Sequence, residues 1–369
     1  MSIGIRVLLL AIGGVSAAVI AVLTLLRLLA PDFAPEAAML LPSLVGRVGG
    51  PAVDAAVTLT AALGALAVFV ISAAVPRSER LPAGIRFAVV LAAALLALVT
   101  PGGVIAAAGY TFALLVVVGI VVLIVLLVLR RPWIGLPLAL VMAVLIGIAV
   151  TSLKATELVP AIFGALEEIL PRMLMALAHL AGAVALLIPV IIDSRRTRGR
   201  FARGVQRHRV AITVLAAMCA LPYVIARASW LTPWPLFGGS ANMLSTQPEV
   251  LLTGLLLALG MLVGGVLTLG LVLPWGERFP RWLVGLGGRP VPLALVVVPA
   301  SIVSVLFTVG GVEMAFFSVG GTVEAASVVL LLAVLPFWLW GPLLGLATWA
   351  YAMKRMASDL DVRARLSIR

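Results

Sequence analysis

The sequence has few charges, two histidines and a single cysteine, and each shortage excludes a class of protein. Only 11% of its 369 residues are charged, whereas soluble domains carry about 25%, so a soluble globular fold is excluded. The lone cysteine, Cys219, rules out a framework of intrachain disulfides. His179 and His208 stand far apart, and no cluster of ligands has the spacing of a metal centre. We therefore expect neither a metal nor another cofactor.

Apolar residues are what the chain has in abundance. They make up 63% of it, and the mean hydropathy is +1.26. Apolar runs of roughly 18 residues or more recur along the length, and each is long enough to cross a hydrocarbon core as a helix. We predict an all-α, polytopic transmembrane bundle. Its ten spans are expected at residues 6–29, 53–75, 84–104, 108–129, 134–154, 171–192, 210–230, 250–273, 290–311 and 324–352.

The positive charges are placed asymmetrically. Most of the 26 lysines and arginines fall on alternate connections between the spans and in the tail that follows residue 353. The positive-inside rule then places both termini in the cytoplasm and the chain in the plasma membrane. The same charges favour contact with anionic lipid headgroups. We expect no nucleic-acid partner, because the basic residues follow the topology of the chain.

A short pattern occurs twice. Residues 76–82 and 274–280 both read P-x-x-E-R-x-P after a long apolar run, and T-x-G-G-V recurs further on at 100–104 and 308–312. Two matches in one order predict an internal duplication. Six spans separate equivalent helices, so the repeat would be parallel, in a 4+2+4 plan. The predicted units are a first repeat (1–132), a connecting helical pair (133–193), a basic cytoplasmic loop (194–209), a second repeat (210–353) and a cytoplasmic tail (354–369).

Two arginines break the positive-inside pattern. Arg27 and Arg227 stand near the outer ends of the first and seventh spans, which are equivalent helices in the proposed repeat. Tyr223 and Trp230 flank Arg227 by about one helical turn on either side, so one face presents a guanidinium between two aromatic rings. One hypothesis is an anion-binding pair. The alternative is that each arginine snorkels outward and pairs with Asp32, Glu36 or Glu249.

Three further titratable residues lie within or beside the predicted spans. His179 is the only histidine inside a predicted span, and it could relay protons or simply pack with one hydrogen bond. Glu313 and Glu324 bracket the last outer loop and are expected to be solvated.

An enzyme motif is also present in part. Residues 167–172 fit E-E-x-x-x-R, the first motif of intramembrane CAAX-processing proteases. That chemistry needs histidines on further helices, and the second histidine, His208, falls in the basic loop. No catalytic set can be assembled, so an enzyme is disfavoured.

The second half of the chain resembles a known family. Residues 275–282 read W-G-E-R-F-P-R-W, 288–292 read G-R-P-V-P, and Pro222, Tyr223, Arg227 and Trp230 fit P-Y-x-x-x-R-x-x-W. Together they resemble a family of multi-pass membrane proteins from high-GC actinobacteria. Residues 232–234 depart from its usual Ala-Leu-Gly. The resemblance covers about residues 209–311 and implies a membrane protein, without an established activity and without catalytic residues.

Two functions remain open. The first is transport or export of a small apolar or anionic molecule, because transporters are commonly built from repeats with a site at their interface. The alternative is a non-catalytic membrane subunit, sensor or scaffold that docks a cytoplasmic protein partner. The residues predicted for docking lie on the two cytoplasmic turns: Glu79, Arg80, Trp275, Glu277, Arg278 and Arg281.

Overall fold

The computed structural model describes most of the chain. The described residues are 3–30, 42–74, 83–103, 121, 124–125, 127–129, 132–152, 170–171, 173–188, 199–240, 244, 248–279, 281, 287–316 and 324–366.

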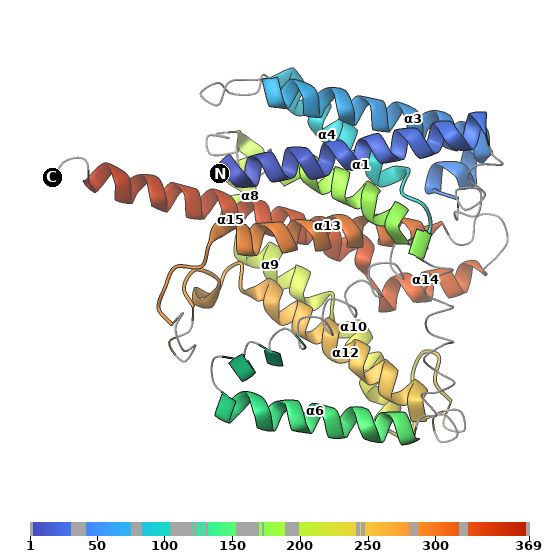
Figure 1. Cartoon of the computed structure of the whole chain (residues 1–369), viewed down its shortest axis with the longest axis vertical. Helices are drawn as coiled ribbons and strands as arrows, with labels where there is room; N and C mark the ends of the chain where they lie inside the picture. The colour runs from blue at the N-terminus through green and yellow to red at the C-terminus, as the bar shows by residue number, and fades with distance from the viewer. Residues whose placement is uncertain are drawn as a thin grey trace.

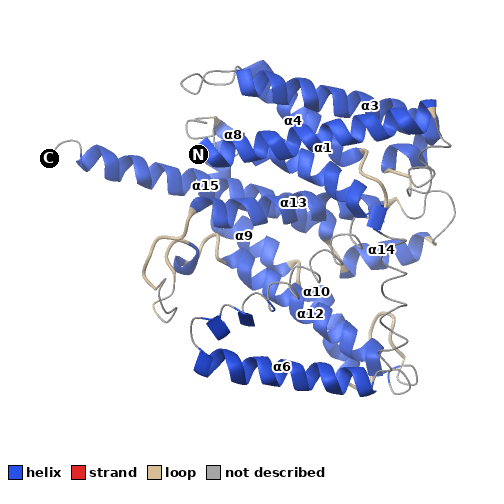
Figure 2. Ribbon diagram, in the orientation of Figure 1, coloured by secondary structure: helices blue, strands red, loops and turns tan. Residues whose placement is uncertain are grey.

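Within these ranges the fold is all-helical, as predicted, and no strand occurs (Figure 2). The named α-helices are α1 (Ile3–Leu29), α3 (Leu44–Ala74), α4 (Ala83–Leu98), α6 (Pro132–Ser152), α8 (Arg200–Arg207), α9 (Arg209–Met218), α10 (Leu221–Ala228), α12 (Pro248–Leu269), α13 (Leu293–Ala315), α14 (Ala325–Val334) and α15 (Phe337–Leu366). A further helix covers Met173–Ile188, and short 3-10 turns, η3 and η4, cover Ser229–Leu231 and Pro274–Gly276.

The helices form two groups on either side of a central pair (Figure 1). On one side α3 packs against α1 and α4, and on the other α12 packs against α9 and α10. The centre is the pair α13 and α15, which also contacts α9. Small residues let the central pair approach closely: a Cβ added to Gly341 would lie 2.4 Å from the backbone nitrogen of Thr308. Helix α6 lies at the edge of the molecule, beyond α12 (Figure 1).

Among the described residues, five helical segments are long and apolar enough to cross a membrane. Four further apolar helices are shorter. Large apolar side chains also cover the exterior, as Leu129 at 74% and Phe87 at 71% exposure illustrate. A hydrocarbon solvent, rather than water, accommodates such a surface. The fourth predicted span, 108–129, lies largely outside the described residues, so the count of ten stays a prediction, as does the orientation of the termini.

Two segments differ from their predicted local structure. The basic connection 194–209, expected to be a loop, contains helix α8, because Ala202 and Val205 make one apolar face that is buried while the arginines point outward. The last span is interrupted: α14 ends at Val334 and α15 begins at Phe337. Pro336 explains the break, since proline lacks the N–H and restricts the residue before it.

The T-x-G-G-V pattern, the second match of the proposed repeat, has a different conformation at each of its two positions. Residues 100–103 form the irregular segment after α4, with Gly103 at a positive φ of 87°, whereas 308–312 lie inside the continuous helix α13. The first turn of the repeat, with Glu79 and Arg80, lies outside the described residues. The parallel 4+2+4 repeat and its unit boundaries therefore stay a prediction.

Candidate functional site

A polar cluster lies inside the first group of helices. Its carboxylate, Asp54, owes its place to a break in α3, where Gly50 has non-helical angles (φ 81°, ψ 175°) and Pro51 restarts the helix. Asp54 then falls in the first turn of the restarted helix, where the helix dipole favours a negative charge. Ser43 lies just ahead of α3, and its hydroxyl accepts a hydrogen bond from the Gly46 N–H at 3.2 Å, which caps the first helical segment.

The Asp54 carboxylate has two partners from separate segments. Arg27 at the end of α1 places its Nη1 3.6 Å from Oδ2, and the Ser43 hydroxyl donates to Oδ1 at 2.5 Å. The side chains of Arg27 and Asp54 are 28% and 10% exposed. Gly46 makes room for the carboxylate, because a Cβ there would lie 3.0 Å from its Cγ. Arg27 is thus already charge-compensated inside the protein.

His179 from the helix Met173–Ile188 completes the cluster. It is 1% exposed, and its Nδ1 lies 2.8 Å from the carbonyl oxygen of Met175. A carbonyl can only accept, so Nδ1 carries a proton and donates it. The other ring nitrogen, Nε2, is buried and has no hydrogen-bond partner. In the neutral ring Nε2 is therefore an acceptor without a donor.

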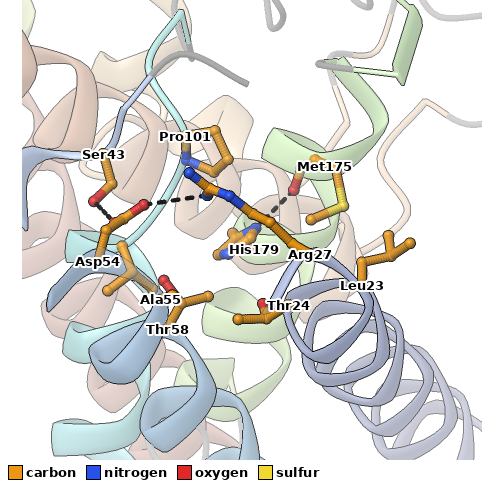
Figure 3. A pocket seen from close by; sticks show the side chains of 11 residues that line it. Leu23, Thr24, Arg27, Ser43, Asp54, Ala55, Thr58, Pro101, Met175 and His179 are labelled. Carbon is orange, nitrogen blue, oxygen red and sulfur yellow. Dashed lines mark hydrogen bonds and ion pairs between the residues drawn. The ribbon is translucent and has the colours of Figure 1, made fainter. Parts of the chain in front are cut away.

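These groups line one small cavity (Figure 3). Its volume is about 30 Å³, which is room for one or two water molecules. Thr24 of α1 and Thr58 of α3 complete the polar part of its wall, while Leu23, Ala55, Val99, Pro101 and Met175 contribute apolar surface. The cavity thus unites ionisable groups from three different helices.

Arg227 occupies a different kind of site in the second group of helices. Its guanidinium carbon lies 4.9 Å from the ring centroid of Tyr223 and 4.1 Å from that of Trp230, so the predicted stacking is present. Its Nη1 also donates to the Phe237 carbonyl at 3.3 Å. Among the described side chains no carboxylate pairs with it, and the side chain of Glu249 lies outside them. The surroundings of Arg27 and Arg227 therefore differ: one is neutralised, and the other is held by aromatic faces.

The turn that carries the family resemblance is held by the last helix. Tyr351 on α15 donates its hydroxyl to the Gly276 carbonyl at 2.7 Å, and Lys354 makes a 2.5 Å ion pair with Glu277. Arg355 donates to the carbonyls of Glu277 and Val291, at 2.9 and 3.0 Å. The turn also pairs with the G-R-P-V-P segment through an isolated bridge between Arg278 and Pro290.

Gly276 is required by close packing within this turn. A Cβ at that position would lie 1.8 Å from the Gly270 carbonyl oxygen. Trp275 packs in turn against Gly270, where an added Cβ would meet its ring at 2.4 Å. Arg278 and Arg281, by contrast, are exposed. The motif therefore combines residues that build the turn with residues left free at the surface.

One expected acidic residue is placed differently from the prediction. Glu313, expected to be solvated, has a side chain only 12% exposed; it accepts the Gly103 N–H at 2.7 Å and lies 3.5 Å from Arg47. These contacts tie α13 to the first group of helices. The prediction was wrong because it used sequence distance from the loop alone. Glu324 is exposed, as predicted.

The residue that sequence reasoning missed is Asp54. It falls one residue inside the predicted span 53–75, and nothing in the sequence groups it with Arg27. The partners predicted for Arg27, Asp32 and Glu36, lie outside the described residues. The available signal was a carboxylate inside an apolar run, which is costly unless it is paired. Its pairing with Arg27 could not be read from spacing along the chain.

The described residues form an all-helical bundle with five candidate membrane-spanning helices and an apolar surface, which is compatible with the class of helical membrane proteins. Within the described residues no group of histidines, cysteines and carboxylates could hold a metal ion. No protein-family model matches the chain, and neither the curated proteins nor the solved structures gave a match. The resemblance drawn from the turn 275–282 therefore rests on its residues alone.

Proposed function

We propose that the protein is a membrane transporter for a small molecule, and that the cluster of Arg27, Asp54 and His179 controls its cycle. The observation that carries the proposal is the meeting of these three groups, from three helices, around one cavity in an apolar bundle. Ionisable groups are expensive in such surroundings and are characteristic of substrate and proton pathways. A bundle held together by apolar packing alone has no need of them.

The proposed cycle depends on competition for Asp54. When Nε2 of His179 takes a proton, a second positive charge enters the cavity and competes with Arg27 for the carboxylate. Arg27, which is already 28% exposed, is then free to bind an anionic group of the substrate. Loss of the proton restores the Arg27–Asp54 pair and releases the anion. A small anionic or amphipathic substrate could take part in this exchange. The exchange also requires the Arg27 side chain to move outward, away from Asp54.

We place the protein in the plasma membrane, with both termini in the cytoplasm. The support for this orientation is the alternation of basic connections along the chain. Arg27 and the polar cluster would then face the exterior.

The accessibility of Thr24 tests the proposal. Thr24 lines the cavity and is 7% exposed, so an impermeant thiol reagent reaches a cysteine there only if the bundle opens. In a Cys219→Ser background, we expect Thr24→Cys to be labelled from both faces of sealed vesicles. Ala17→Cys is the matched control, since Ala17 lies on the same helix, is fully buried and does not line the cavity. If Thr24→Cys remains unlabelled from both faces, the transporter proposal is wrong.

A scaffold or subunit role is the second candidate, and one observation favours it. Exposed arginines gather where α8 and the turn both pack on α15: Arg200, Arg203, Arg207, Arg278, Arg281 and Arg289. Such a basic surface suits an acidic protein partner or anionic headgroups. The charge reversals Arg278→Glu and Arg281→Glu would abolish crosslinking to a partner in cells while leaving Thr24 labelling unchanged.

A further inference from the structure

Helix α8 stands directly before a candidate membrane-spanning helix. The span Arg209–Leu231 begins two residues after α8 ends at Arg207. Val210, the second residue of that span, is 54% exposed, so apolar surface of the kind that hydrocarbon covers starts within one helical turn of α8. In a bilayer that covers this span, the polar headgroups therefore lie at the level of α8.

One face of α8 is fixed against the last helix. This buried face packs on α15, where Gln206 donates its side-chain amide to the Ala350 carbonyl at 2.8 Å. The Phe201 ring also stacks on the ring of Trp349 of α15, with centroids 5.8 Å apart, yet Phe201 remains 67% exposed. An exposed aromatic ring beside a basic helix is typical of the boundary between headgroups and acyl chains.

The opposite face of α8 carries three exposed arginines. Arg200, Arg203 and Arg207 are spaced by three and four residues, so they share one side of the helix. Gly204 lies on the same side, and a Cβ added there would meet no atom within 4 Å. In the part of the chain that the structure describes, the space over this arginine face is therefore open to a ligand.

The arginine face is not neutralised by the described residues. No ion pair joins Arg200, Arg203 or Arg207 to a described carboxylate, and the sequence has no aspartate or glutamate from residue 194 to residue 248. Three guanidinium groups at this level attract an anion, and each can bind phosphate oxygens in a bidentate pair. The anion that a bilayer offers at the level of its headgroups is the phosphate of an anionic phospholipid.

We propose that α8 is an interfacial helix that binds anionic phospholipid, with its arginine face on the headgroup phosphate and with Phe201 and Trp349 beside the acyl chains. The proposal assigns the α8 part of the basic surface to lipid and leaves the arginines around the turn 275–282 for a protein partner. It does not rest on the transport cycle, because no residue of the Arg27 cluster takes part in it.

Lipid titration of the full-length protein tests the site. Native mass spectrometry in detergent gives the Kd for phosphatidylglycerol and for phosphatidylcholine with the same acyl chains, and we expect the first to bind more tightly. Arg203→Gln should raise the Kd for phosphatidylglycerol about fivefold, the contribution of one basic residue near an anionic surface. Arg200→Gln, Arg203→Gln and Arg207→Gln together should raise it at least about tenfold and leave the Kd for phosphatidylcholine unchanged.

The matched control removes the same charge beside the turn. Arg278→Gln, Arg281→Gln and Arg289→Gln together also remove three exposed arginines, and they should leave both Kd values unchanged. Phe201→Ala, by contrast, should weaken the two lipids alike, because it removes a contact with acyl chains.

Three results would overturn the proposal. Equal losses in the two triple variants would mean general attraction without a site at α8. Full competition by glycerol 3-phosphate, which has the phosphate and no acyl chains, would mean a site for a free phosphate compound. Unchanged lipid affinity in the α8 triple variant, with loss of crosslinking to a protein in cells, would assign the arginine face to an acidic protein partner. None of these results bears on Thr24 labelling, so this proposal and the transporter proposal can fail separately.

Discussion

The turn beside α15 and the cavity beside α1 both gather charged residues, yet they satisfy them differently. At the turn, Glu277 has a lysine partner, and the carbonyls of Gly276, Glu277 and Val291 each receive a side-chain donor from α15. At the cavity, one ion pair stands beside an imidazole nitrogen without a partner and beside a space large enough for water. At the turn, each of these groups has a hydrogen-bond or ion-pair partner. At the cavity, Nε2 of His179 has none.

This difference separates a rigid network of charged groups from one that is incompletely paired. A satisfied network fixes one geometry, since every alternative loses hydrogen bonds. A network with an unpaired acceptor beside a small cavity leaves room for a second arrangement of its side chains. The motif of residues 275–282, which is the most specific in the sequence, therefore belongs to the rigid turn. Asp54 and His179, which belong to no motif, line the cavity whose polar groups are incompletely paired. The predictions below test each side of this contrast.

The largest effect is expected from a methyl group in the turn. Gly276→Ala places a Cβ 1.8 Å from the Gly270 carbonyl oxygen, and a backbone atom cannot yield as a flexible side chain can. We expect a loss of at least about 3 kcal/mol in the free energy of unfolding, measured by SDS titration in mixed micelles. Gly64→Ala, where a Cβ meets open space, should be neutral or slightly stabilising. Equal effects of the two would show that the turn is loosely packed.

The ion pair of the cavity should give the next largest effect. Asp54→Ala leaves Arg27 without its partner in a half-buried site, so we expect a loss of about 2 kcal/mol, less than the cost of breaking a fully buried pair. Arg27→Gln combined with Asp54→Ala should recover part of this loss, because the stranded charge is then gone. The coupling energy from the double-mutant cycle is the measurement. A cycle without coupling would mean that the 3.6 Å contact is not an energetic pair.

A hydroxyl at the turn should matter less. Tyr351→Phe removes the donor to the Gly276 carbonyl while keeping the ring, and the site is buried, so the carbonyl loses a bond that water cannot replace. We expect a loss of about 1 kcal/mol in the free energy of unfolding, from the same SDS titration. Tyr223→Phe provides a comparison, because that ring acts through its face on Arg227. Identical losses would argue against a specific hydroxyl contact at Tyr351.

Contacts between residues close together in the sequence could be predicted, whereas contacts between residues far apart in the sequence could not. The helical class and the stacking of Arg227 between Tyr223 and Trp230 were predictable, since both follow from residues at most a few turns apart. The Arg27–Asp54 pair was not, because the break at Gly50 and Pro51 decides which way the carboxylate faces. Glu313 shows the same limit: its partners are Arg47 on α3 and Gly103 in the segment after α4, and only tertiary packing brings them together.

The smallest effect concerns the ion pair between Lys354 and Glu277, and here pH supplies the test. The hydrogen bond from Lys354 holds the pKa of Glu277 below its ordinary value of 4.5. The unfolded chain therefore binds a proton more readily than the folded one, so the pair stabilises the fold above about pH 4.5, and this stabilisation is lost as the pH falls through the lowered pKa. Both side chains are more than one third exposed, so the contribution should stay below about 1 kcal/mol and weaken in salt.

Melting temperatures of the wild type and Glu277→Gln between pH 3 and pH 7 would measure this contribution. We expect the wild type to melt higher at neutral pH and the two curves to converge under acid, while Lys354→Met reproduces the neutral-pH deficit. Since Arg355 and Tyr351 hold the same turn through backbone carbonyls, their hydrogen bonds do not titrate in this range. If the melting temperatures of the wild type and Glu277→Gln still differ at low pH, Glu277 acts through packing and through hydrogen bonds that do not need its charge. The rigidity of the turn would then come from the hydrogen bonds that Tyr351 and Arg355 donate to its backbone carbonyls.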